Sequence, residues 1–100
     1  MIRYQRSLRA AGGKAREATA WAQEVTAYLN GKFTGTQFQA FTQRFGDVDT
    51  ISWQADFESL ASLDSYQQAV IADQGYWALV DKTGGLFAEG SLHDTVFQAL

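Results

Sequence analysis

The sequence contains no cysteine and no proline, and its single histidine is His93. Without cysteine, the chain has no disulfide, no thiolate metal site and no cysteine nucleophile. One histidine cannot supply the histidine cluster of a zinc site. No apolar run comes near the roughly 18 residues that a membrane-spanning helix requires, and the basic start of the chain lacks the apolar centre of a secretory signal. We therefore expect a cytoplasmic protein, and we predict no bound metal or cofactor.

Positive charge is also scarce. The formal net charge is −3, which argues against a nucleic-acid-binding protein, because such a protein needs a dominant positive surface. Seven of the eight basic residues precede Phe45, whereas nine of the eleven acids follow it. A basic arm that binds an acidic partner is one interpretation. We favour the other, a basic first strand that lies beside acidic later strands and pairs with them across the sheet.

Aromatic residues, by contrast, are abundant: 14 % of the chain is Phe, Trp or Tyr. The length predicts a single domain, residues 1–100, with a modest core. Aromatic side chains bury much surface each, so they fill a core, line a cavity or cover an interface.

The hydrophobic period changes at Phe57. Up to that residue apolar and polar side chains alternate, which predicts a strand with one apolar and one polar face. Beyond it the apolar residues follow helical spacing, at Leu60, Leu63, Tyr66 and Val70. We expect Ser62 to be the N-cap of this helix.

The same criteria place the remaining elements. We predict strands at Met1–Arg9, Gly35–Phe45, Ile51–Phe57 and Ser91–Leu100, helices at Lys14–Leu29 and Ser62–Asp73, and a short helical piece at Tyr76–Asp81. Asn30 and Gly31 are expected to end the first helix, and Gln74 and Gly75 to interrupt the second. The order βαββαβ predicts an α+β, ferredoxin-like fold: a four-stranded antiparallel sheet in the order fourth, first, third, second, with both helices on one face.

Alternation along the strands divides the sheet into two faces. The apolar set, expected under the helices, is Ile2, Tyr4, Leu8, Ile51, Trp53, Ala55 and Phe57. The polar set is Arg3, Gln5, Ser7, Ser52, Gln54 and Asp56. We expect the polar face to look into a pocket that a second subunit closes.

Two segments resemble known proteins. The run ISWQADFESLASLDSYQQAVIADQGYWALV resembles the part of dimeric α/β-barrel proteins in which the third strand leads into the second helix and a Tyr-Trp pair follows. The tail LFAEGSLHDTVFQAL is similar to the end of members of the NIPSNAP, EthD and antibiotic-biosynthesis monooxygenase groups. Those relatives often carry proline where this chain has Gln74. The resemblance implies a homodimer whose two sheets face each other and enclose a pocket.

His93 and Asp56 are the candidate catalytic residues. The pKa range of histidine suits a general base or an axial haem ligand, although a lone histidine on a strand is more often structural. Asp56 can activate a substrate, but a cross-strand ion pair with Arg3 is the plainer interpretation.

The candidate ligand-binding residues are Arg3, Gln5, Gln39, Phe41, Gln54, Tyr76 and Trp77. Tyr76 and Trp77 follow the break at Gly75, where they can close a pocket mouth, pack at a dimer interface or cover the sheet. Trp21 and Trp53 fall on apolar stripes and are predicted to be core residues.

We expect a homodimer that binds a small molecule. If the protein is an enzyme, the resemblance favours a cofactor-independent monooxygenase or cyclase that acts on an aromatic or polyketide-like metabolite. A non-catalytic dimeric binding or accessory protein is the alternative. An RNA-recognition sheet shares the element order, but its third strand carries basic residues, whereas TISWQADF carries an acid.

Overall fold

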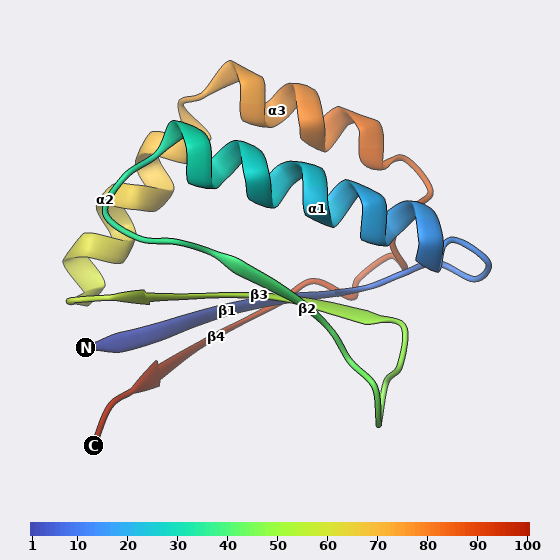
Figure 1. Ribbon diagram of the computed structural model, residues 1–100, viewed down its shortest axis with the longest axis horizontal. Coiled ribbons are helices and arrows are strands. Elements are labelled where there is room, and N and C mark those ends of the chain that lie inside the picture. The colour runs from blue at the N-terminus through green and yellow to red at the C-terminus, as the bar shows by residue number, and fades with distance from the viewer.

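The strand β1 (Ile2–Arg9) lies inside an antiparallel sheet and pairs along its length with two neighbours. In the computed structural model, which describes residues 1–100, β3 (Thr50–Phe57) lies on one side of β1 and β4 (His93–Gln98) on the other. β2 (Gln39–Thr42) pairs with the outer edge of β3. The resulting order β2-β3-β1-β4 confirms the predicted topology, and all the helices lie on one face of the sheet (Figure 1).

The long helix α1 (Ala15–Lys32) crosses the sheet with a narrow stripe of small and branched residues. Its buried residues are Ala18, Ala22, Val25 and Leu29. Two alanines in this stripe let the helix approach the strands closely, because each presents only a methyl group. Trp21, predicted as core, is partly buried at the edge of the stripe.

The helix α2 (Leu60–Ile71) begins two residues earlier than expected. Its N-cap is Ser59, whose hydroxyl oxygen accepts a hydrogen bond from the backbone N–H of Ser62 at 3.2 Å. Ser59 has the extended backbone of an N-cap and follows the strand almost directly, so the prediction of Ser62 as the cap was wrong. Ser62 is the residue that the cap binds.

Asn30 lies inside α1 instead of ending it. Its side-chain amide donates to the carbonyl oxygen of Phe38 at 2.9 Å, and its Oδ1 accepts from the N–H of Phe38 at 2.8 Å. This pair of bonds satisfies the backbone of Phe38 with a helix side chain. Phe38 therefore does not join the ladder, and β2 begins at Gln39. The strand spans Gln39–Thr42, so the predicted strand Gly35–Phe45 was too long.

Asp73 separates α2 from α3 (Gln74–Val80) and caps the latter. One carboxylate oxygen accepts from the N–H of Tyr76 at 2.9 Å and from the hydroxyl of Tyr28 at 2.5 Å, and Lys32 lies 3.3 Å from the other oxygen. The break thus precedes the expected pair Gln74 and Gly75, which lie in the first turn of α3. A Cβ at Gly75 would overlap the Tyr28 hydroxyl, so any other residue here would have to displace the hydroxyl that binds Asp73.

The two faces of the sheet separate as predicted. Ile2, Tyr4, Ile51, Trp53, Ala55 and Phe57 are all buried under the helices, and Leu8 packs against them. The fold is α+β and ferredoxin-like, with α3 and a short 3₁₀ helix (Asp81–Thr83) added after the second helix. None of its helices is both long and apolar enough to cross a membrane.

We predict that Asn30→Ala lowers the free energy of unfolding by about 1–3 kcal/mol, because the substitution leaves the backbone N–H and C=O of buried Phe38 without partners. Urea unfolding measures the loss. Gln23→Ala is the control, since it removes an exposed amide side chain from the same helix. Equal stability of the two variants would contradict the role of Asn30.

Candidate ligand-binding site

A cavity of about 710 Å³ lies between the helices and the sheet. Of the 19 residues that line it, 15 are hydrophobic. The lining residues come from β1, β3, β4, all three α-helices and the 3₁₀ helix, and from the segments that precede β2 and β4. Its size and its apolar lining match the pockets that hold small organic ligands, which span about 300–1,000 Å³.

Trp21, Trp53 and Trp77 line the cavity, and each indole is held in place by a hydrogen bond. The indole of Trp21 donates to the carbonyl oxygen of Leu79 at 2.8 Å, and that of Trp53 donates to the hydroxyl of Thr26 at 3.0 Å. The two rings meet edge to face with centroids 6.1 Å apart. Phe87 packs edge to face on Trp21 at 5.6 Å, because its segment pairs with the end of β1. The wall is therefore aromatic and pre-formed.

One ion pair interrupts the apolar lining. Arg6 of β1 and Asp94 of β4 stand opposite each other in the ladder and form two hydrogen bonds, Nε to Oδ1 at 2.8 Å and Nη2 to Oδ2 at 2.9 Å. About a third of each side chain is exposed. The bonds from Arg6 hold the pKa of Asp94 below its usual range, so the carboxylate is ionised at neutral pH.

Two tyrosines add hydroxyl groups beside the cavity. Burial raises the pKa of Tyr4, which lies near Arg6 and Asp94, to about 12. Burial alone raises the pKa of Tyr66 to about 12. The Tyr66 hydroxyl is buried without a hydrogen-bond partner, and its ring packs on Phe33, Phe38 and Phe57. Both phenols are therefore neutral near pH 7.

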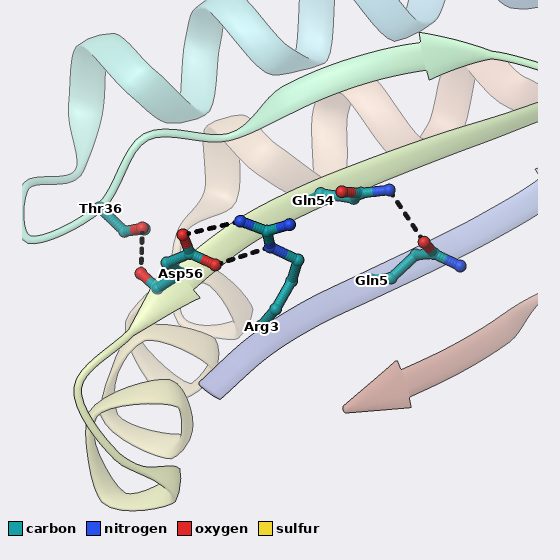
Figure 2. A network of polar contacts seen from close by, with 5 residues as sticks. All are labelled: Arg3, Gln5, Thr36, Gln54 and Asp56. Atoms are coloured by element: carbon teal, nitrogen blue, oxygen red, sulfur yellow. Dashed lines mark hydrogen bonds and ion pairs between the residues drawn. The ribbon is translucent and has the colours of Figure 1, made fainter. Parts of the chain in front are cut away.

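A second polar network lies on the opposite face of the sheet, which we call the back face (Figure 2). Arg3 forms two hydrogen bonds with Asp56, at 2.8 and 3.1 Å, and this confirms the predicted ion pair. Hydrogen bonds from Arg3 lower the pKa of Asp56, which makes its carboxylate a weak base. Gln54 donates to Gln5 at 2.9 Å, and Thr36 donates to the backbone oxygen of Asp56 at 2.7 Å.

His93 also lies on the back face, exposed and opposite Ser7 in the ladder. It lines a cleft of about 410 Å³ that has no hydrophobic residue in its wall. Asp56 lies opposite Arg3 and His93 lies opposite Ser7. Arg3 and Ser7 are four residues apart along β1, so Asp56 and His93 are separated by about 13 Å in the direction of the strand. The two predicted catalytic residues are therefore too far apart to act on one atom together.

The predicted site residues thus fall into two groups. Tyr76 and Trp77 line the helix-side cavity. The others share the back face: Arg3, Gln5, Gln39, Phe41, Gln54, Asp56 and His93. The larger cavity is consequently on the side of the sheet opposite to the one expected.

Sequence reasoning missed Arg6 and Asp94 as cavity residues. The signal was present, because Arg6 interrupts the apolar alternation of β1 between Tyr4 and Leu8. A charge on an otherwise buried face needs a partner. Asp94 was harder to find, since apolar side chains lie on both faces of the last strand. No three side chains of His, Asp or Glu are close enough together to hold a metal ion.

Solved structures with the same fold are numerous, although their sequences differ from this one. A NIPSNAP domain protein from Burkholderia xenovorans superposes with a TM-score of 0.83 at 13% identity, covering 100% of this chain and 95% of its own. A NIPSNAP family protein from Agrobacterium tumefaciens gives 0.77 at 18% identity, covering 99% and 92%.

An antibiotic biosynthesis monooxygenase gives a TM-score of 0.73 at 11% identity, covering 100% of this chain and 99% of its own. No protein-family model matches the sequence, and no curated protein matches it either. These comparisons confirm the resemblance inferred from the sequence at the level of the fold.

We predict that Tyr66→Phe raises the free energy of unfolding by about 1–2 kcal/mol, because it removes a buried hydroxyl that has no partner and keeps the ring. Tyr28→Phe is the matched control: it removes the hydroxyl that binds Asp73, so it should destabilise the fold. Thermal unfolding of both variants tests the contrast. A destabilised Tyr66→Phe protein would mean that its hydroxyl has a partner in solution.

Proposed function

We propose that this protein binds an aromatic small molecule in the helix-side cavity and acts as a homodimer through the back face of its sheet. The observation that carries the proposal is the cavity itself, which is large enough for two or three fused rings and is walled by fixed tryptophans. Planar rings gain from edge-to-face and stacked contacts with such a wall.

The homodimer is supported by the uncovered face of the sheet. No helix lies on the back face (Figure 1), and two large apolar side chains, Phe41 and Phe97, are exposed on it. Phe45 and Val48 are exposed nearby in the β2–β3 hairpin. The pairing of Arg3 with Asp56 reduces the cost of covering this face, because these two charges would lose their water as a pair and not singly.

The finer proposal is catalysis without a cofactor, either oxygenation or cyclisation of the bound aromatic molecule. In oxygenation, a ring methylene and dioxygen would give a ring carbonyl and water, with the substrate supplying the electrons. A dry cavity favours such chemistry by desolvating the activated substrate. Tyr4 and Asp94 line the cavity, where the neutral phenol of Tyr4 can donate a hydrogen bond to a substrate and the carboxylate of Asp94 can accept one. His93 and Asp56 could contact only a substrate bound to the back face. A non-catalytic binding protein with the same cavity is the alternative.

Cavity binding predicts that Val80→Trp weakens binding of a fused-ring ligand at least about tenfold, because the added indole fills the lined space. The test ligand is 1,8-dihydroxyanthrone, and quenching of protein fluorescence under nitrogen measures its affinity. Ala20→Trp adds the same ring to the exposed side of α1 and should bind like the unaltered protein.

The same complex, opened to labelled dioxygen, separates enzyme from binder. Incorporation of label into a ring carbonyl, faster than without protein and slowed by Val80→Trp, identifies an oxygenase. Release of the unchanged ligand identifies a binding protein. Equal binding by the Val80→Trp and Ala20→Trp variants would refute the cavity as the site.

Dimerisation through the back face predicts that Phe41→Asp raises the dimer dissociation constant about tenfold or more, since it places a new charge in the apolar part of the interface. Light scattering across a dilution series measures the mass. Leu60→Asp is the control, because it changes an exposed leucine at the N-terminus of α2, where an acid is tolerated. A monomer in the unaltered protein at micromolar concentration would refute the dimer.

A further inference from the structure

The cavity contains one acid and one base that are charged at neutral pH, and they bind each other. Among its 19 lining residues, only Arg6 and Asp94 carry a full charge. Their two hydrogen bonds are short, 2.8 Å from Nε to Oδ1 and 2.9 Å from Nη2 to Oδ2. The pair therefore has no net charge, and the guanidinium offers no uncompensated charge to a ligand.

The pair still has hydrogen-bonding capacity. An arginine side chain has five N–H donors, and only two of them are used here. Each carboxylate oxygen of Asp94 accepts one bond from Arg6 and keeps another lone pair. Both side chains line the cavity, so the pair can offer a ligand donors and acceptors close together and without net charge.

We propose that the cavity selects uncharged aromatic molecules that carry a carbonyl next to a hydroxyl, and that Arg6 and Asp94 set this specificity. The proposal rests on the proposed function of the cavity and names its class of ligand. The ligand carbonyl accepts from a free N–H of Arg6, and the ligand hydroxyl donates to Asp94. An aromatic carboxylate is disfavoured, because it must lose water beside Asp94 and finds the Arg6 charge already neutralised.

The back face supplies a matched pair for comparison. Arg3 and Asp56 form the same two-bond contact on the other side of the sheet, where they touch nothing in the cavity. Asp56→Asn and Asp94→Asn are therefore the same chemical change in equivalent contacts on opposite faces. Only the second leaves a free guanidinium charge in the cavity.

Two ligands that differ in one group test the inference. 1-Hydroxy-2-acetonaphthone is neutral and carries a hydroxyl next to a ketone. 1-Hydroxy-2-naphthoic acid has the same rings and hydroxyl, but a carboxylate replaces the ketone at neutral pH. Titration calorimetry on the unaltered protein should give affinity about tenfold higher for the ketone. Asp94→Asn should raise the affinity for the carboxylate roughly tenfold, because Arg6 is then free to pair with it. Asp56→Asn should change neither affinity.

The outcomes separate the two proposals. If neither naphthalene binds, and the Val80→Trp and Ala20→Trp variants bind the anthrone alike, the cavity proposal itself fails. If both bind in the cavity but the unaltered protein prefers the carboxylate, or Asp94→Asn leaves the ratio of affinities unchanged, the specificity inference is overturned while the cavity proposal stands. An equal shift of the ratio by Asp56→Asn also overturns the inference, since it would reflect overall charge and not a contact in the cavity.

Discussion

The central position of β1 is the constraint on which the rest of the structure depends. Because side chains alternate across a strand, β1 sends Tyr4 and Arg6 toward the helices and Arg3 and Gln5 toward the back face. A shift of one residue in its register would exchange the two sets. Two arginines resist such a shift, since Arg3 pairs with Asp56 of β3 and Arg6 pairs with Asp94 of β4. The basic first strand thus pairs with acids on both of its neighbours.

The fold could be predicted from the sequence because its determinants are local and periodic. The change of period at Phe57 separates β3 from α2, and the topology follows from the order of the elements and the charge pattern. Boundaries were less predictable where a side chain competes with the backbone. Ser59 and Ser62 are the same residue type and are equally suited to cap a helix. Ser59 is the cap because it lies closer to the end of β3. Asparagine is common at helix termini, yet Asn30 lies within α1 and binds the backbone of Phe38.

The cavity was less predictable than the fold. Its volume depends on how far α1 and α2 stand from the sheet, and that distance results from packing between side chains that lie far apart in the sequence. The unpartnered hydroxyl of Tyr66 has no signature in the sequence, because whether a tyrosine finds a hydrogen-bond acceptor is decided by residues distant along the chain. The sequence did indicate Tyr76 and Trp77 as possible pocket residues, because they are aromatic and follow a helix break. Both line the cavity.

β4 joins the two halves of the functional proposal. This strand is held chiefly by its ladder with β1, and its side chains are largely exposed on both faces. It contributes Asp94 to the helix-side cavity and Phe97 to the back face, so one strand belongs to both the proposed ligand site and the proposed dimer interface. A partner subunit that covers Phe97 would hold β4 from the back face, just as Arg6 holds it through Asp94 on the cavity side. Dimerisation would then stabilise the strand that carries Asp94 without contributing a residue to the cavity, because Asp94 and Phe97 lie on opposite faces of that strand.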